Sequence, residues 1–129
     1  MPGKIALDTD IAIKFLNGDK AIDKFLSKYS EICMPVVVVG ELIFGALNLK
    51  HAEQNLARHK KLIQRSRILE ITEATANTYA KARLSLKKKG KPIPENDLWI
   101  ASVCIEYNVS LLSSDRHFKD IDHLRLEYL

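Results

Sequence analysis

Short runs rich in Ile, Val and Leu alternate with longer segments of helical apolar spacing along the whole of this 129-residue chain. Strands that alternate with helices are typical of βαβ units, in which a mainly parallel sheet is covered by helices on both faces. Apolar residues dominate the short runs, as strands buried on both faces require. The pattern predicts an α/β fold, with strands at residues 4–7, 31–34, 68–71, 109–112 and 124–126.

Helices are expected between these strands, at residues 10–16, 20–28, 36–49, 52–64, 72–90 and 96–107. The third is ambiguous at its start, because Val36 to Val39 could continue a strand, but its length and apolar spacing favour a helix. Thr9 or Asp10 is the expected N-cap of the first helix, and Asn96 that of the last. The length suits one hydrophobic core, so we expect a single domain over residues 1–129.

Composition limits the cellular compartment and the class of protein to which the chain can belong. No apolar run approaches the ~18 residues that a membrane span needs. The start, Met1-Pro2-Gly3-Lys4, lacks the apolar core of a signal peptide. Two cysteines, Cys33 and Cys104, are too few for a disulfide framework or a cysteine-rich zinc site. We therefore expect a cytoplasmic protein with no membrane contact and with both thiols reduced in the core.

Four carboxylates lie in or beside apolar runs, where an acidic side chain needs a partner or a cation. They are Asp8, Glu41, Asp97 and Asp115. Asp8 and Asp115 follow the first and fourth expected strands, and open α/β sheets bind ligands at the carboxyl ends of their strands. Glu41 and Asp97 lie on the apolar faces of their expected helices.

Each acid has a simpler explanation when it is taken alone. Asp8 could be a turn residue at a strand end, Asp97 an acid favoured by the helix dipole, and Asp115 the cap of a short following segment. Glu41 is harder to explain, because a Glu that faces the core from the middle of a helix needs a partner. Together the four predict one shared site for a hard divalent metal.

The chemistry of such a site follows from the residue types. Clustered carboxylates raise one another's pKa, and a bound Mg²⁺ or Mn²⁺ relieves that repulsion. The metal can lower the pKa of a bound water and polarise a phosphoryl oxygen. The histidines lack the spacing of a zinc site, and most are expected on the surface. They are His51, His59, His117 and His123.

Charge is distributed unevenly along the chain. Residues 50–91 hold twelve Lys or Arg and three Glu, a local net of +9, whereas the remainder has a net of −5. All four acids lie outside this basic segment. A basic surface beside an acidic, metal-binding centre suits a polyanionic substrate, although any single Lys run is more simply a solvated helix face.

With these features in place, the sequence resembles PIN-domain proteins, specifically the VapC-type toxin ribonucleases of toxin–antitoxin pairs. Four segments carry the resemblance, and their order and spacing match the family over essentially the whole chain. They are Leu7-Asp8-Thr9-Asp10, Gly40-Glu41-Leu42-Ile43-Phe44-Gly45-Ala46, Ile93-Pro94-Glu95-Asn96-Asp97-Leu98-Trp99-Ile100-Ala101 and Leu112-Ser113-Ser114-Asp115-Arg116-His117-Phe118. Each motif alone is weak, but the ordered set is specific.

The resemblance implies a three-layer α/β/α domain with a short, mainly parallel five-stranded sheet, and a Mg²⁺- or Mn²⁺-dependent endoribonuclease. The four acids match the family's acidic positions, and Thr9 and Ser113 match polar positions that support the first and last of them. The resemblance also implies a homodimer and a small VapB-like antitoxin that inserts a segment into the active-site groove. Asp10 stands where Asn or Ser is common, and we favour a capping role for it over a place in the site.

The resulting hypothesis is that Asp8, Asp97 and Glu41 hold a metal ion, with help from Asp115, and that the site hydrolyses RNA phosphodiesters. Lys and Arg side chains of the basic segment would hold the RNA backbone. Arg83 and Lys87 are chosen for this role from their helix positions alone.

Two other functions compete with this one. In a haloacid dehalogenase-type phosphatase, Asp8 would attack phosphorus and Asp10 would act as general acid. Ala12 stands where that family usually has Thr or Val, and Glu41 would have no task. In a catalytically inactive RNA- or protein-binding module the basic segment alone would matter, and four acids would be unnecessary.

Overall fold

Five parallel strands form one sheet in the order β3-β2-β1-β4-β5 in the computed structural model, which describes residues 3–129. The strands are β1 (Lys4–Leu7), β2 (Glu31–Pro35), β3 (Arg67–Leu69), β4 (Ser110–Ser113) and β5 (Leu126–Tyr128). All four strand pairings are parallel. The α/β fold that the alternating pattern predicted is confirmed. Met1 and Pro2, part of the start used to argue against a signal peptide, lie outside the described residues.

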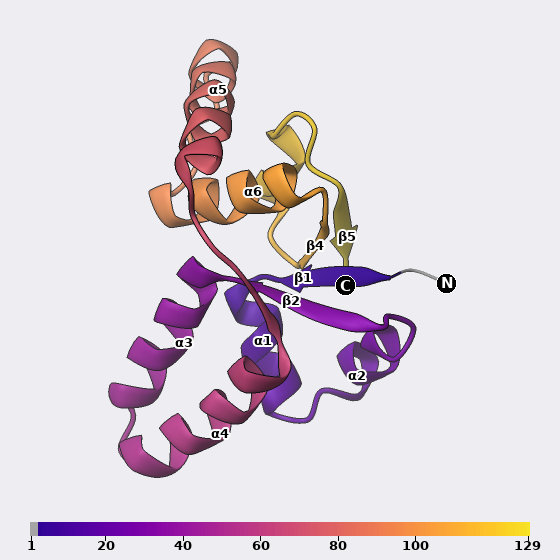
Figure 1. Cartoon of the computed structure of the whole chain (residues 1–129), viewed down its shortest axis with the longest axis vertical. Helices are drawn as coiled ribbons and strands as arrows, with labels where there is room; N and C mark the ends of the chain where they lie inside the picture. The colour runs from indigo at the N-terminus through magenta and orange to yellow at the C-terminus, as the bar shows by residue number, and fades with distance from the viewer. Residues whose placement is uncertain (1–2) are drawn as a thin grey trace.

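Helices cover both faces of the sheet and make three layers. They are α1 (Thr9–Leu16), α2 (Lys20–Leu26), α3 (Val36–Leu47), α4 (Ala52–Arg65), α5 (Glu73–Lys89), α6 (Glu95–Tyr107) and a short 3₁₀ helix, η1 (Arg116–Asp120). Figure 1 shows α1 to α4 on one side of the sheet and α5 and α6 on the other. None of the helices within residues 3–129 combines the length and apolarity that a membrane crossing requires.

Several boundaries differ from the sequence prediction, each for a local reason. The helix favoured over a strand at Val36 to Val39 is confirmed, because α3 begins directly after Pro35 and buries the stripe Val38, Leu42 and Ala46. It ends at Leu47, two residues earlier than expected. The last strand begins two residues later than expected, at Leu126. It is an edge strand that pairs only with β4, and its Glu127 and Tyr128 are exposed, so apolar residues do not mark it.

The central strand is β1, and its position fixes the site. It pairs with β2 on one side and with β4 on the other, so the strand order reverses beside it. Leu7 lies opposite Leu112 in the register with β4. The next residues, Asp8 and Ser113, therefore meet at the carboxyl edge of the sheet, where open α/β folds bind their ligands.

A hydrophobic core holds this edge in place. Ile5, Ala6 and Leu7 of β1 and Leu111 and Leu112 of β4 are fully buried. Complete burial of one Leu or Ile side chain contributes about 1.5–3 kcal/mol to folding. Cys33 and Cys104 are buried free thiols, as expected. The buried core therefore extends to Asp8 and Ser113 at the carboxyl edge of the sheet.

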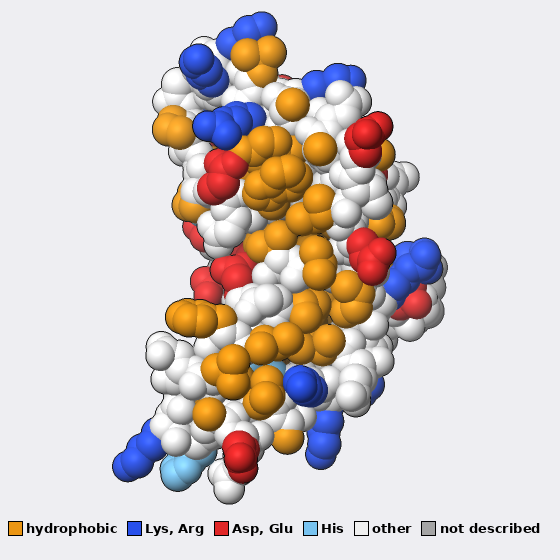
Figure 2. All heavy atoms as spheres, turned by 60° about the vertical axis from the view of Figure 1, so that its left-hand side comes forward, with side chains coloured by type: hydrophobic (Ala, Val, Ile, Leu, Met, Phe, Trp, Pro, Cys, Tyr) orange, Lys and Arg blue, Asp and Glu red, His pale blue; other side chains and the backbone are white. Residues whose placement is uncertain are grey.

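The basic segment does not form one continuous surface. Residues 50–91 run through α4, β3 and α5, and these two helices lie in opposite layers (Figure 1). Figure 2 shows Lys and Arg gathered toward the two ends of one face, with acidic side chains and a band of hydrophobic ones between them. The expected basic surface beside the acids is thus divided into two flanks.

Candidate metal centre

Asp8 is the most buried acid of the site, with 5% of its surface exposed. It ends β1 and is the N-cap of α1, where its Oδ1 accepts a hydrogen bond of 2.8 Å from the Thr9 backbone N–H. Its Oδ2 accepts one of 2.7 Å from the Ser113 hydroxyl. The prediction that Thr9 or Asp10 caps α1 was wrong, because Asp8, which has an extended backbone at the end of β1, is the N-cap.

Burial raises the pKa of Asp8 to about 6. The hydrogen bonds from Ser113 and Thr9 lower the pKa, and the negative charges of Asp97 and Asp10 raise it. At Asp8 the effect of burial is larger than that of the two hydrogen bonds, so the net shift of the pKa is upward. A carboxylate with this pKa would be ionised more readily if a cation lay beside it.

Glu41 is held between two helices that are distant in sequence. Its Oε1 accepts a hydrogen bond of 2.8 Å from the Thr9 hydroxyl, and its Oε2 accepts one of 2.9 Å from the Asn96 amide. Asn96 was expected to cap α6, but Pro94 occupies the N-cap and makes no side-chain cap bond. The amide of Asn96 instead links α6 to α3 across the site.

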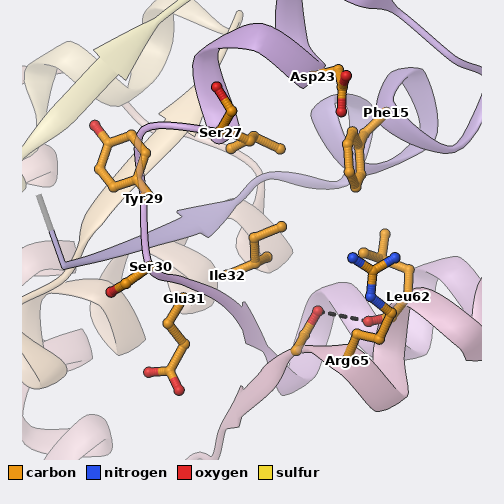
Figure 3. Close-up of a pocket in the computed structure, with 11 residues that line it drawn as sticks. Phe15, Asp23, Ser27, Tyr29, Ser30, Glu31, Ile32, Leu62 and Arg65 are labelled. Carbon is orange, nitrogen blue, oxygen red and sulfur yellow. Dashed lines mark hydrogen bonds between the residues drawn. The ribbon is translucent and has the colours of Figure 1, made fainter.

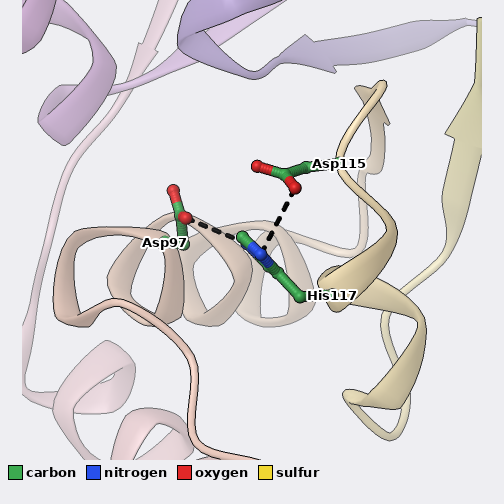
Figure 4. A group of neighbouring side chains, drawn as sticks. All are labelled: Asp97, Asp115 and His117. Carbon is green, nitrogen blue, oxygen red and sulfur yellow. Dashed lines mark ion pairs between the residues drawn. The ribbon is translucent and has the colours of Figure 1, made fainter.

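Asp97, Asp115 and His117 form a compact group at the same edge (Figure 4). His117 Nε2 lies 2.9 Å from Asp97 Oδ2, and His117 Nδ1 lies 3.3 Å from Asp115 Oδ1. One potential ligand atom from each of the three residues lies within 4.8 Å of the others. The pKa of Asp97 is raised by burial, and His117 offsets part of that effect.

The hydrogen bonds and charge interactions connect the four predicted acids. The charge of Asp97 raises the pKa of Asp8, and the charges of Asp115 and Glu41 raise the pKa of Asp97. Ser113 adds a further link, since its Oγ accepts a hydrogen bond of 3.0 Å from the Asp115 backbone N–H while its hydroxyl donates to Asp8. Four carboxylates from separate parts of the chain therefore meet in one place.

Three other predicted residues are exposed on helix surfaces. Asp10 lies in the first turn of α1, where its charge still raises the pKa of Asp8. Arg83 and Lys87 are exposed on α5, where they line a hollow of about 410 Å³ together with Pro92 and Ile93. The Arg83 guanidinium lies 3.5 Å from Glu95 and donates to the Tyr79 hydroxyl.

Two residues of the site were missed from the sequence. Asn96 was read only as a helix cap, and His117 as a surface residue. Most histidines were expected on the surface, which holds for His51 and His123 but is wrong for His59 and His117. His59 is buried, with Nδ1 2.9 Å from the Leu42 carbonyl oxygen. The one available signal for His117 was its position two residues after Asp115.

The donor set fits a divalent cation. Carboxylate oxygens suit Mg²⁺ and Mn²⁺, and an imidazole nitrogen adds a donor that first-row transition ions accept. His117 Nε2 is enclosed and lies 2.9 Å from Asp97 Oδ2, so a nitrogen donor stands directly beside a carboxylate oxygen. The residues present therefore fit a divalent cation in oxygen donors and in charge.

A second hollow, of about 390 Å³, lies beside the amino-terminal start of β2, at the edge of the sheet opposite the acids. Phe15 of α1, Asp23 of α2 and Arg65 of α4 surround it (Figure 3). Its side chains are mixed in charge, and most of them come from helices or from the loop before β2. The acids at the carboxyl edge remain the candidate site.

Known sequences resemble the chain along almost its full length. A model of the PIN domain matches residues 5–124. Ribonuclease VapC1 of Haemophilus influenzae (strain R2866) is 32% identical over 124 residues, which cover 92% of each chain. Ribonuclease VapC2 of Rickettsia felis is 32% identical over 128 residues and 94% of each chain. The tRNA(fMet)-specific endonuclease VapC of Shigella flexneri is 28% identical over 127 residues and 96% of each chain.

Solved structures share the fold closely. The VapBC2 complex of Rickettsia felis, bound to a DNA fragment from its promoter, contains a chain that superimposes with a TM-score of 0.89 at 28% identity, and the match covers 97% of this chain and 98% of that one. VapBC-1 of nontypeable Haemophilus influenzae gives a TM-score of 0.87 at 30% identity, with 97% of each chain covered.

Proposed function

We propose that this chain, which belongs to the PIN-domain family, is the endoribonuclease toxin of a toxin–antitoxin pair. The observation that carries the proposal is the meeting of Asp8, Glu41, Asp97 and Asp115 at the carboxyl edge of the sheet. The relatives named ribonuclease VapC support the reaction class, and the VapBC complexes support the pairing with an antitoxin.

Asp8, Glu41 and Asp97 would hold Mg²⁺ or Mn²⁺, with help from Asp115. Such a cation supplies an activated water and stabilises the negative charge that develops on a phosphodiester. The protein supplies the geometry: Thr9 and Asn96 fix both oxygens of Glu41, and Ser113 fixes Asp8. Burial keeps Asp8 poorly hydrated, so its attraction for a cation is stronger than it would be in open water.

RNA would enter between two basic flanks. Arg83 and Lys87 line the hollow beside the start of α6, the helix that carries Asp97, and we propose that they contact the RNA backbone. The basic residues of α4 form the other flank. Phosphate contacts of this kind position a nucleic acid without reading its sequence.

A homodimer and a VapB-like antitoxin are the proposed protein partners. Large apolar side chains are exposed on α3 and α5, including Phe44 at 69%, Leu47 at 57% and Leu84 at 52%. The hydrophobic band of Figure 2 lies between the two basic ends. Contiguous exposed apolar surface of this kind marks protein contacts. A cytoplasmic location, where RNA substrates are abundant, completes the proposal.

The two competing functions explain less. The phosphatase needs Asp10 as general acid, but Asp10 is exposed outside the cluster of carboxylates, and Glu41 has a place in the site that the phosphatase does not use. A pure binding module gives no reason for four acids at one edge, where the charge of Asp97 raises the pKa of Asp8 and the charges of Asp115 and Glu41 raise that of Asp97.

Induced expression in a bacterial host tests the proposal. The unmodified chain should arrest growth and generate new RNA 5′ ends, whereas Asp97→Asn should do neither. Asp10→Asn, which removes an exposed charge of the same kind, should behave as the unmodified chain does. Co-expression of a small protein encoded directly upstream should restore growth. Equal toxicity of Asp97→Asn, or growth arrest without new RNA ends, would contradict the proposed function.

A further inference from the structure

His117 occupies a position in the site that the four acids alone do not explain. Its ring lies between Asp97 and Asp115, with one nitrogen directed at each carboxylate (Figure 4). A histidine that only covered the site would not need both nitrogens on acids. The arrangement instead resembles a ligand with its supporting group.

The spacing of His117 and Asp97 suits two ligands of one ion. Two neighbouring ligands of an octahedral ion, each bonded at about 2.1 Å, lie about 3.0 Å apart. The observed separation of His117 Nε2 and Asp97 Oδ2 is 2.9 Å. In the tautomer with the proton on Nδ1, the enclosed Nε2 can offer its lone pair to an ion that Asp97 Oδ2 also binds.

The other ring nitrogen has the partner that a metal-bound histidine requires. Histidine ligands almost always donate their second N–H to a carboxylate or a carbonyl, which fixes the ring and strengthens the ligand. His117 Nδ1 lies 3.3 Å from Asp115 Oδ1. Asp115 is more exposed than Asp97, with 47% of its side chain accessible against 15%, as suits an outer supporting carboxylate.

The backbone around His117 is held firmly enough for such a role. His117 lies in η1, and the next residue, Phe118, is fully buried in the core. The His117 ring also packs against the Phe118 ring, with centroids 4.8 Å apart. This anchor directs His117 back toward α6 and away from solvent.

We propose that His117 binds the divalent cation through Nε2, and that Asp115 acts by holding His117 through Nδ1. This inference rests on the proposed metal-dependent function, and it deepens that function by naming a nitrogen ligand. Imidazole favours first-row transition ions over Mg²⁺. The site should therefore prefer Mn²⁺ to Mg²⁺ more strongly than a site built from four carboxylates alone.

Pulsed electron paramagnetic resonance with Mn²⁺ as the probe tests the proposal. The purified full-length chain, loaded with Mn²⁺ in the absence of Mg²⁺, should show ¹⁴N modulation from a directly bound imidazole, and ¹⁵N-histidine labelling should change it. His117→Ala should bind Mn²⁺ without that modulation. His51→Ala, which removes an exposed histidine at the start of α4, should keep it. Where His117→Ala folds poorly, the labelled unmodified chain still shows whether any histidine binds Mn²⁺ directly, and His51→Ala shows whether that histidine is His51.

Affinities provide the second readout. The preference for Mn²⁺ over Mg²⁺ should fall about tenfold or more in His117→Ala. Asp115→Asn should keep the ¹⁴N modulation while its Mn²⁺ affinity falls about 10- to 100-fold, as loss of an outer partner does. Tight Mn²⁺ binding without nitrogen modulation in the unmodified chain would overturn the assignment of His117 and leave the proposed nuclease intact. Failure to bind Mn²⁺ or Mg²⁺ at all would contradict both proposals.

Discussion

Replacement of Asp8 by Asn should make the metal-free protein more stable at neutral pH while it removes activity. Asn has nearly the same shape as Asp, so its oxygen can still accept from the Thr9 backbone N–H, and the Ser113 hydroxyl can turn to accept from the new amide. The substitution removes the negative charge of Asp8, a residue with only 5% of its surface exposed.

The magnitude follows from the pKa of Asp8. Because burial raises this pKa from 3.8 to about 6, the folded protein binds the proton more tightly than the unfolded chain does. The stability that the protonated carboxyl provides is fully present below about pH 4 and is lost as the pH rises through about 6. The shift from 3.8 to about 6 corresponds to about 3 kcal/mol at pH 8. Since the hydrogen bonds of the introduced amide will be less favourable than those of the carboxylate, a gain of about 1–3 kcal/mol is expected.

Urea denaturation in the presence of EDTA measures this difference. The free energy of unfolding of the unmodified chain should fall between pH 4.5 and pH 7.5, and the difference from Asp8→Asn should widen over the same range. Asp10→Asn controls for the loss of one negative charge near α1, and should change stability by less than about 0.5 kcal/mol, as exposed substitutions do. Added Mn²⁺ should stabilise the unmodified chain more than it stabilises Asp8→Asn.

Lower stability of Asp8→Asn than of the unmodified chain at pH 8 in EDTA, with both folded at pH 4.5, would refute this expectation. That result would mean that the hydrogen bonds from Ser113 and Thr9 outweigh desolvation. A difference that does not vary with pH would also contradict the raised pKa of Asp8.

Three further changes have defined outcomes. Ser113→Ala removes a donor to Asp8, so it should raise the pKa of Asp8 further and cost about 1–3 kcal/mol at pH 8 in urea denaturation, with a smaller loss at pH 4.5. Phe118→Ala should cost about 3–5 kcal/mol, because Phe118 is fully buried, and a thermal melt with unchanged midpoint would contradict this. The double change Arg83→Ala/Lys87→Ala should weaken RNA binding at low salt and reduce its salt dependence, which filter binding at two salt concentrations measures.

Much of the architecture could be predicted because local and global requirements agree. Asp8 and Asp115 could be assigned to strand ends from the apolar runs before them, and the rule for open α/β sheets then placed them at one edge. Glu41 and Asp97 could be assigned to inward helix faces from spacing alone. The edge strands were located less well, because β3 and β5 have three residues each and pair on one side.

The missed residues depend on tertiary contacts that no local pattern specifies. Asn96 is one residue beyond the true start of α6, and its use as a donor to Glu41 requires α3 and α6 to approach each other. His117 faces the acids because Phe118 anchors η1 in the core. The basic segment is continuous in sequence, but the sheet lies between α4 and α5. The basic residues of the segment are therefore divided between two faces of the molecule.

Cleavage of RNA by the purified chain tests the central claim most directly. Total cellular RNA should be cut at defined sites in Mg²⁺ or Mn²⁺, and EDTA should stop the reaction. Asp8→Asn should be folded and more stable at pH 8. It should cut RNA at least about 100-fold more slowly than the unmodified chain, since it loses one charge that stabilises the reacting centre. Cleavage by Asp8→Asn that is undiminished and resistant to EDTA would contradict the account.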